Sequence, residues 1–361
     1  MSRLFEPARA GVIDLRNRVV MAPLTRCRAD EAAGDLPGSA MNVEYYRQRS
    51  NAGLIISEGT QVSPLGKGYM ATPGIYSDAQ VQGWKAITEA VHARGSRIVA
   101  QLWHVGRISH PELTGGLQPV APSAVPARVV IHTHSGKHEA PMPRALSVED
   151  IAAVVAQFRQ AAANAMRAGF DGVEIHGANG YLVDQFLRDG SNHRQDAYGG
   201  SVEKRCRFAL EVVDAVSAEV GRDRVGIRLS PVSPANDITD SQPQAVFGHL
   251  IGELNQRRIA FIHFIEGATG GQRDLTGFDF AWARRHWQGF YIANNGYTRE
   301  TALEAVEQDR ADAIAFGRLF IANPDLVPRL KAGAALAQPN ARTYYKPGPE
   351  GYIDYPALEE A

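Results

Sequence analysis

Short apolar runs alternate with amphipathic segments along almost the whole chain. Eight such runs, rich in Val and Ile, are separated by stretches of helical spacing or by loops. Short continuous apolar runs between helices are typical of parallel strands that are buried on both faces. The eight runs are 18–22, 53–57, 97–102, 172–175, 225–229, 261–265, 290–293 and 313–316.

The segments between the runs carry helix boundaries. Residues 147–168 begin with Ser147 and place Asp150 three positions later, which is close to a capping box. Apolar residues then recur at helical spacing, and Gly169 follows where a helix C-cap is expected. The ranges 80–94, 201–220 and 298–308 predict further helices. Eight strand–helix units in a chain of 361 residues predict a (β/α)8 TIM barrel.

Two regions depart from this repeat. The first 17 residues predict a short β-hairpin, which would suit a lid on the closed end of the barrel. Residues 104–146 form a long excursion after the third strand, and loops of this length are uncommon unless they are functional. No linker interrupts the chain, so we expect a single domain over 1–361 with 104–146 as a capping excursion. An open doubly wound sheet is the alternative, but it usually carries a GxGxxG turn where this chain reads PLTRCR.

Composition narrows the functional class. The 38 Lys and Arg residues nearly balance the 39 Asp and Glu residues, which argues against a nucleic-acid partner. Two cysteines, Cys27 and Cys206, cannot build a four-Cys zinc site or an all-Cys iron–sulfur cluster, and they fit a reducing, cytoplasmic location. No signal peptide or run of about 18 apolar residues is present, so no membrane partner is expected. The near-zero net charge leaves both a monomer and a homodimer open.

The loops that follow the strands are where a barrel of this type carries its chemistry. The loops after the seventh and eighth strands form the usual phosphate site. Here they supply Asn295 and Gly296, then Gly317 and Arg318. Backbone N–H groups and a guanidinium fork both suit a phosphate. The two loops together therefore predict that the ligand carries a phosphate.

Five longer motifs follow one another along the chain. They are APLTR at 22–26, QLWHVGR at 101–107, HGANGYLVDQFL at 176–187, SNHRQDAYGGS at 191–201 and AFGRLFIANPDL at 315–326. In this order they resemble the Old Yellow Enzyme family of FMN-containing ene-reductases. The similarity extends from LFEPARAG to EGYIDYP, and the most similar branch is the bacterial one with N-ethylmaleimide and nitrate-ester reductases. The resemblance implies bound FMN, NADPH or NADH as hydride donor, and small activated alkenes or nitro compounds as substrates.

By this resemblance, FMN lies across the mouth of the barrel. Gln101 offers a donor and an acceptor, which match the pyrimidine edge of the flavin. Arg228 lies in an apolar strand and needs a partner. An anionic reduced flavin is one candidate, and an ion pair with Glu58 or Glu174 is the other; the family motif favours the flavin. The residues expected to bind FMN are Pro23, Leu24, Thr25, Gly59, Gln101, Arg228, Asn295, Gly296, Gly317 and Arg318.

The resemblance also implies the catalytic residues. His176 and Asn179 would share one helical face if their loop makes a helical turn, and would then donate two hydrogen bonds to the substrate oxygen. Tyr181 is the expected general acid, because a phenol of pKa near 10 is protonated at neutral pH. Hydride would pass from NAD(P)H through flavin N5 to the β-carbon, with ping-pong kinetics. The other expected substrate contacts are Tyr69, Trp103, Gln242 and Tyr352.

Two other interpretations are weighed against this one. A non-catalytic FMN-binding redox sensor would have no need of the His176, Asn179 and Tyr181 set. The HTHSGKH segment at 132–138 could bind a metal, since His-rich tracts do so. No carboxylate or cysteine lies close in sequence to complete a ligand set. We therefore expect no metal site and an exposed loop or hairpin there.

Overall fold

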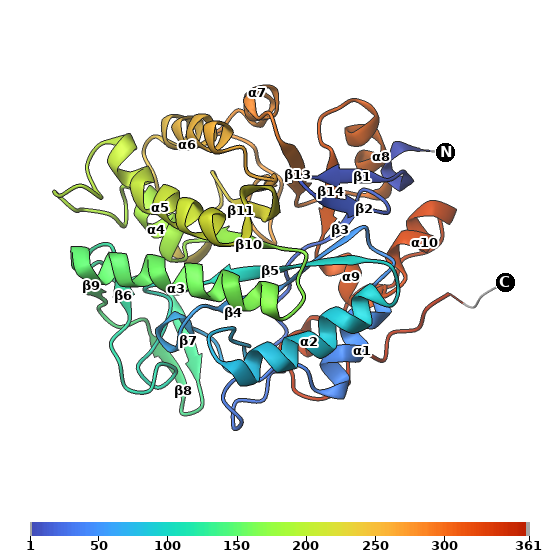
Figure 1. The fold of residues 1–361 in the computed structure, drawn as a ribbon, viewed down its shortest axis with the longest axis horizontal. Helices are drawn as coiled ribbons and strands as arrows, with labels where there is room; N and C mark the ends of the chain where they lie inside the picture. Colours follow the sequence, from blue (N-terminus) through green and yellow to red (C-terminus); the bar gives the residue numbers. More distant parts are fainter. Residues whose placement is uncertain (1, 359–361) are drawn as a thin grey trace.

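A computed structural model describes residues 2–358, and its centre is a closed barrel of eight parallel strands (Figure 1). Each barrel strand pairs with the next barrel strand along the chain, and β14 closes the ring by pairing with β3. The closed barrel confirms the predicted (β/α)8 fold and excludes the open sheet. The strands are β3 (Val19–Met21), β4 (Leu54–Gln61), β5 (Arg97–Trp103), β10 (Gly172–Gly177), β11 (Val225–Leu229), β12 (Phe261–Ile265), β13 (Phe290–Asn294) and β14 (Ala313–Phe316).

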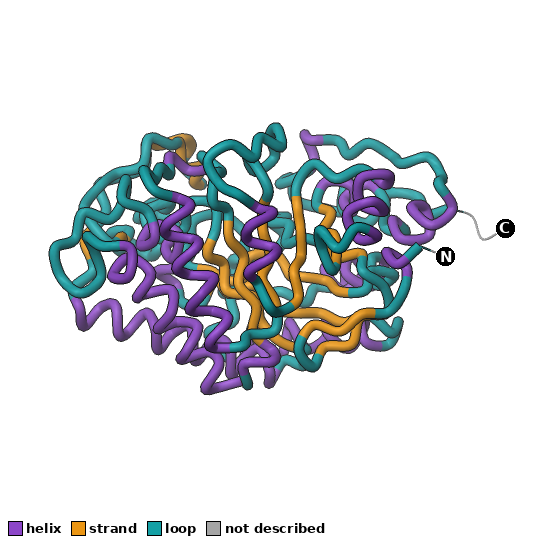
Figure 2. Tube along the Cα trace, turned by 90° about the horizontal axis from the view of Figure 1, so that it is seen from above, coloured by secondary structure: helices purple, strands orange, loops and turns teal. Residues whose placement is uncertain are grey.

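The helices lie around the strands, which gather in the interior (Figure 2). The predicted capping box at Ser147 is present, because its hydroxyl accepts from the Asp150 N–H and the Asp150 side chain accepts from the Ser147 N–H. Ser201 and Thr298 cap their helices at the predicted positions. The α-helices are α1 (Ala40–Gln48), α2 (Asp78–His92), α3 (Val148–Arg167), α4 (Leu182–Leu187), α5 (Val202–Val220), α6 (Pro243–Arg257), α7 (Phe280–His286), α8 (Arg299–Glu307), α9 (Arg318–Ala322) and α10 (Leu326–Ala332).

The predicted N-terminal hairpin closes one end of the barrel. Its antiparallel strands, β1 (Ala8–Ala10) and β2 (Ile13–Leu15), share a buried cluster with residues at the amino ends of the barrel strands. Gly11 makes the turn with a φ of +59°, and a Cβ there would lie 2.0 Å from the carbonyl oxygen of Asp223. A side chain at this turn is therefore excluded both by conformation and by space.

The excursion after β5 covers the opposite end of the barrel. It holds β6 (Val120–Ala121), β7 (Val130–Thr133), β8 (Gly136–Glu139) and β9 (Arg144–Ala145). The HTHSGKH segment forms the antiparallel β7–β8 hairpin, in agreement with the expected loop or hairpin. Ile131 and Ala140 of this region share a buried cluster with Trp103 and Tyr181. The excursion therefore packs directly on residues at the carboxyl ends of the strands.

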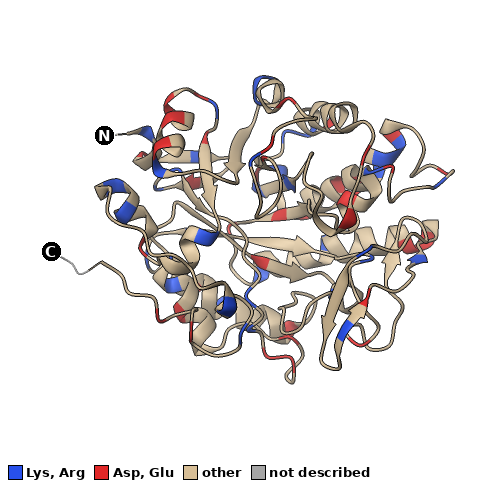
Figure 3. Ribbon diagram, turned by 180° about the vertical axis from the view of Figure 1, so that it is seen from behind, with Lys and Arg blue, Asp and Glu red and all other residues tan. Residues whose placement is uncertain are grey.

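Positively and negatively charged residues are distributed over the whole ribbon (Figure 3). Two carboxylates lie close to histidines of the β7–β8 hairpin, although the spacing along the sequence did not indicate this. Glu31 lies 3.2 Å from His134, and Glu112 lies 3.6 Å from His138. Within residues 2–358, no group of three His, Cys, Asp or Glu side chains is placed to hold a metal ion. No helix of the described chain is both long enough and apolar enough to cross a membrane.

Candidate active site

Buried polar side chains line the inside of the barrel on neighbouring strands. In the strand register, Gln101 of β5 lies beside Glu174 of β10, and Arg228 of β11 lies between His176 and His263. Gln101 Nε2 donates to Glu174 Oε1 over 2.8 Å, and the other Glu174 oxygen lies 2.8 Å from His263 Nδ1. Because parallel strands end at one edge, these residues form a continuous polar surface there.

Arg228 forms neither of the ion pairs that the sequence left open. Its Nη2 donates to Asn294 Oδ1 over 2.8 Å, whereas its buried Nε has no partner among residues 2–358. Burial lowers the pKa of Arg228 to about 10, so it is charged at neutral pH. Burying a charged guanidinium with an unbonded N–H costs free energy unless an acceptor bonds to that N–H. This donor therefore fits a ligand with an acceptor group, as a flavin has. Its protein partner, Asn294, was not predicted.

Gln101 keeps one amide hydrogen and its carbonyl oxygen for a ligand, because only one Nε2 hydrogen is needed for Glu174. A donor and an acceptor side by side match the edge of a flavin ring.

The absence of a side chain at Gly59 has a different explanation from the expected close approach of its backbone to the flavin. A Cβ there would lie 2.4 Å from the Trp103 ring, so the glycine makes room for this indole.

The loops after the last two strands meet where the phosphate was expected. Asn295 and Gly296 both have positive φ angles, +93° and +70°, and form a tight turn after β13. Arg318 is exposed, and its side chain bonds only to the carbonyl oxygen of Gly270, at 3.4 Å. Arg273, which was not predicted, lies beside the turn. Its Cβ is 3.3 Å from the position that a Cβ at Gly296 would occupy. The aliphatic part of the Arg273 side chain therefore borders this turn, while its guanidinium donates to Glu266 Oε2 and to the Tyr297 hydroxyl.

A buried aromatic group unites four of the predicted residues. The Tyr181 ring lies 5.0 Å from both the Trp103 and the His176 ring, edge to face. The Tyr69 ring stacks on Trp103 at 5.4 Å, and its hydroxyl lies 2.8 Å from the Tyr181 hydroxyl. Burial raises the pKa of Tyr181 well above its usual value and that of Tyr69 to about 12. Both phenols are therefore protonated at neutral pH, as a proton donor must be.

His176 is neutral and presents a donor. Burial lowers its pKa well below the usual value, and the charges of Arg228 and His263 lower it further. The N–H of Ala178 donates to Nδ1 over 3.4 Å, which assigns the ring proton to Nε2. His176 therefore offers an Nε2–H group without a positive charge.

Asn179 is held in an unusual conformation. The helical turn that the spacing suggested is absent, because Asn179 adopts a left-handed φ of +60°. Its backbone N–H donates to Ser230 Oγ over 2.8 Å, and its carbonyl oxygen accepts from Asn236 Nδ2 over 2.8 Å. Its side-chain oxygen accepts from Thr269 Oγ1 over 2.6 Å. The amide nitrogen is left as the free end of the side chain.

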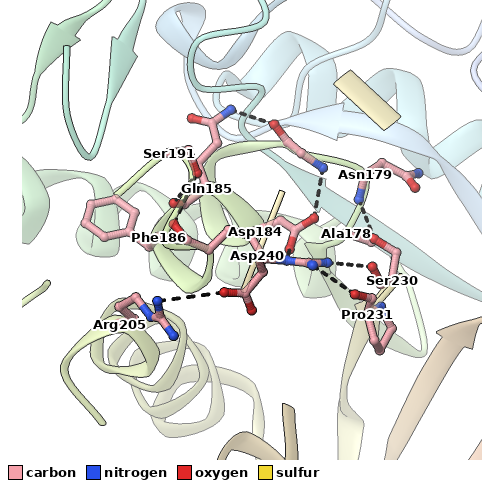
Figure 4. Close-up of polar contacts among 12 residues, drawn as sticks. Ala178, Asn179, Asp184, Gln185, Phe186, Ser191, Arg205, Ser230, Pro231 and Asp240 are labelled. Carbon is pink, nitrogen blue, oxygen red and sulfur yellow. Dashed lines mark hydrogen bonds and ion pairs between the residues drawn. The ribbon is translucent and has the colours of Figure 1, made fainter. Parts of the chain in front are cut away.

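A buried ion pair holds the loop that carries these residues (Figure 4). Arg188 Nε donates to Asp184 Oδ1 over 2.7 Å, and the two side chains are 3% and 0% exposed. The other Asp184 oxygen accepts from the N–H of Gly180. Arg188 also donates to the carbonyl oxygens of Ser230 and Pro231, at 2.5 and 2.9 Å. This pair therefore joins the loop after β10 to the loop after β11.

Two of the expected substrate contacts are not supported. Tyr352 is fully buried, stacks on Tyr45 at 4.1 Å and accepts from Asn42 Nδ2, so its placement in a pocket wall is wrong. The apolar C-terminal segment folds this tyrosine into the core between α1 and Arg26. Gln242 is exposed at the residue before α6, and no hydrogen bond of the described residues joins its side chain to the aromatic group.

Tyr345 is the tyrosine of the C-terminal segment that reaches the site. It is 64% exposed and lies close enough to Tyr69 and Tyr181 for its charge to raise the pKa of both. The resemblance implied Tyr352 as the tyrosine of this segment, although several tyrosines stand close together between 344 and 355.

Comparisons with known proteins show which family the chain resembles. The sequence profile of the NADH:flavin oxidoreductase / NADH oxidase family matches residues 3–337. 12-Oxophytodienoate reductase 7 of Oryza sativa subsp. japonica is 44% identical, over 98% of this chain and 94% of its own. A probable flavin mononucleotide-dependent alkene reductase of Leishmania infantum is 43% identical, over 98% and 97%.

Solved structures resemble the whole chain. An old yellow enzyme homologue from Zymomonas mobilis superposes with a TM-score of 0.95 and is 45% identical, covering 98% of this chain and 99% of its own. Morphinone reductase superposes with a TM-score of 0.92 and is 46% identical, covering 99% and 96%. At this identity and coverage, the similarity extends to the loops as well as to the barrel.

Proposed function

This chain belongs to the NADH:flavin oxidoreductase / NADH oxidase family, the Old Yellow Enzyme family, and from this we propose that it reduces the C=C bond of α,β-unsaturated carbonyls, maleimides and nitroalkenes. It is an FMN-dependent oxidoreductase of the ene-reductase class that uses a nicotinamide cofactor. We further propose nitrate esters as acceptors, and residues 1–361 as one FMN-binding domain with 104–146 as its cap.

The proposal is carried by one observation: hydrogen-bond donors at the end of β10 and in the loop that follows it lie beside the polar ends of the neighbouring strands. His176 offers Nε2–H, Asn179 offers its amide nitrogen and Tyr181 offers a protonated phenol. Below them, Gln101 and the unpaired Nε of Arg228 suit the edge of a flavin. The turn at 295–296 and residues 317–318 would hold its phosphate. When bound, FMN supplies hydride transfer between the nicotinamide and the alkene.

The side chains would divide the remaining chemistry. His176 and Asn179 donate to the substrate oxygen, and these bonds strengthen as negative charge develops on it. Tyr181 gives its hydroxyl proton to the α-carbon, and the Tyr69 hydroxyl at 2.8 Å stabilises the phenolate that remains. Trp103 and the hairpin residue Ile131 belong to the buried cluster that keeps water from this region.

An absorption spectrum with two anaerobic additions tests the proposal. We expect the purified protein to show flavin bands, NADPH to bleach them, and 2-cyclohexenone to restore them. Bands that bleach but return only with a nitro compound or a nitrate ester would contradict the enone assignment. A stable FMN complex that neither NADPH nor NADH reduces would contradict catalysis. Parallel double-reciprocal plots are expected for a shared site, and intersecting plots would contradict it.

A further inference from the structure

The amide of Asn179 has two chemically different ends. An asparagine can present either its oxygen as an acceptor or its nitrogen as a donor, and a simple rotation exchanges them. A substrate carbonyl or nitro group needs the nitrogen. Something must therefore decide which end faces the substrate, and the loop after β12 contains a group placed to do so.

Thr269 makes that contact as part of a short chain of hydrogen bonds. The Thr269 N–H donates to Ser233 Oγ over 3.1 Å. The Ser233 hydroxyl donates to Thr269 Oγ1 over 3.0 Å, and Thr269 Oγ1 donates to Asn179 Oδ1 over 2.6 Å. Ser233 and Thr269, which lie in two other loops, thus form a series of hydrogen bonds that ends on the amide oxygen of Asn179.

The direction of these hydrogen bonds follows from the burial of Ser233. The Thr269 backbone N–H can only donate, so it occupies an acceptor position on Ser233 Oγ. Ser233 is 2% exposed, and Thr269 Oγ1 is the remaining polar atom that the structure places within reach of its proton. If Thr269 donated to Ser233 instead, the serine proton would be buried without an acceptor, which is costly. The proton of Thr269 is therefore free to go to Asn179.

The backbone of Asn179 cannot relax to avoid this contact. Its N–H is fixed by Ser230, and its carbonyl oxygen by Asn236. The left-handed φ of +60° also restricts the directions open to the side chain. With the backbone fixed and the amide oxygen bonded to Thr269, the end of the side chain that points away from Thr269 is Nδ2, whose two hydrogens remain for a ligand.

We propose that Thr269 is a positioning residue that keeps Asn179 a hydrogen-bond donor and so commits the site to substrates with an acceptor oxygen. Carbonyl, nitro and nitrate-ester groups meet this requirement, whereas a group that offers only N–H donors does not. The proposal rests on the proposed function of Asn179 and adds the residue that sets its orientation. Thr269 lies in the GATGG segment, whose sequence gave no reason to single out its threonine.

The test is a binding measurement on the oxidised FMN-loaded protein. Cyclohexanone is the probe, because this saturated ketone has the acceptor oxygen but no C=C bond to reduce. Its dissociation constant is obtained from the change in flavin absorbance. We expect Thr269→Val, which removes the hydroxyl at nearly constant shape, to weaken binding by about three- to tenfold, the range of one hydrogen bond. Thr269→Ser restores the hydroxyl and should bind within about twofold of the parent.

A double-mutant cycle separates positioning from a general structural effect. In an Asn179→Ala background, Thr269→Val should have no further effect, because the group through which it acts is gone. Equal losses in both backgrounds, or a Thr269→Val protein that binds like the parent, would overturn the proposal. If Asn179→Ala alone leaves ketone binding unchanged, the proposed role of Asn179 itself fails. Should Thr269→Val not retain FMN, Ser233→Ala decides instead: it should weaken ketone binding, and unchanged binding would overturn the proposal.

Discussion

The two sides of the active site are built in different ways. The floor, which we define as Gln101, Glu174, Arg228 and His263, consists of strand residues in successive register and is held by bonds inside the barrel. The roof, which we define as Tyr69, Trp103, Asn179, Tyr181 and the 130–139 hairpin, comes largely from loops. It is held by contacts between one loop and another, such as that of Thr269 with Asn179.

Because of this difference, we expect the floor to bind the cofactor and the roof to bind and protonate the substrate. Strand residues in a closed barrel cannot move independently, so the floor has a fixed pattern of donors and acceptors. Loop residues are only as well placed as the bonds between loops. We therefore expect changes in the floor to alter FMN binding, and changes in the supports of the roof to alter substrate binding and proton transfer.

The largest effect is expected at the ion pair that supports the roof. Arg188→Ala leaves Asp184 buried without its cation and removes two bonds to the loop after β11. Breaking a buried pair in this way costs about 3–5 kcal/mol of the free energy of unfolding. Urea unfolding of the variant and the parent measures this loss of the free energy of unfolding. Arg207→Ala, which breaks an exposed pair with Glu211, is the control and should cost less than about 0.5 kcal/mol. Equal losses would contradict the importance of this support.

Proton transfer is the next largest effect. Tyr181→Phe should slow reoxidation of the reduced flavin by 2-cyclohexenone by about 10²-fold or more, because it removes a general acid. Reduction of FMN by NADPH should stay within about twofold, since that step needs no such proton. Stopped-flow absorbance separates the two steps. Burial raises the Tyr181 pKa, so the parent rate should not fall as pH rises from 7 to 10. A fall within this range, or equal slowing of both steps, would contradict the assignment.

The floor could be predicted from the sequence to a large extent. Buried parallel strands appear as short apolar runs, and all eight barrel strands were located to within a few residues. A charged residue such as Arg228 stands out within such a run. Its partner Asn294 does not, because strand register depends on the closure of the barrel, which no local pattern contains.

The roof was only partly predictable, for a physical reason. His176, Asn179 and Tyr181 lie in one short motif, so a resemblance finds them together. The contacts from other loops depend on how separate segments fold over one another. This is why Tyr352 was chosen in place of Tyr345, and why Thr269 was missed. The helical turn expected at 176–179 also failed, since its left-handed asparagine is stabilised by bonds to residues of the next loop.

Cofactor binding tests the floor itself. Arg228→Met removes the buried guanidinium whose Nε is unpaired, and should raise the dissociation constant for FMN by about 10- to 100-fold, the range of a hydrogen bond to a charged group. Fluorescence titration of the apoprotein with FMN measures it. Arg97→Ala, at the exposed opposite end of a barrel strand, is the control and should bind FMN as the parent does. Unchanged affinity in Arg228→Met would contradict the role of the floor.

The smallest effect is expected where the excursion is tied to the loop after β11. Asp237 accepts from the backbone N–H and the guanidinium of Arg128, and these bonds lower the pKa of its carboxyl. Because that native pKa is lowered, the charged form stabilises the attachment above the unfolded pKa of about 3.9 and loses this effect only as pH falls below it. Asp237→Asn should speed amide hydrogen exchange in 128–140 by less than about fivefold at pH 7, since the pair is exposed.

Acidification distinguishes this carboxylate from the other groups that hold the hairpin. Exchange in the parent protein, corrected for its intrinsic pH dependence, should stay constant from pH 7 to 5 and rise only below about pH 4. A change between pH 7 and 5 would instead show that the Asp237 carboxylate does not set the pH dependence of the hairpin. In either case the barrel strands should keep their protection, because the floor has no bond to Asp237. Loss of protection in both parts together would show that the roof and the floor are not independent.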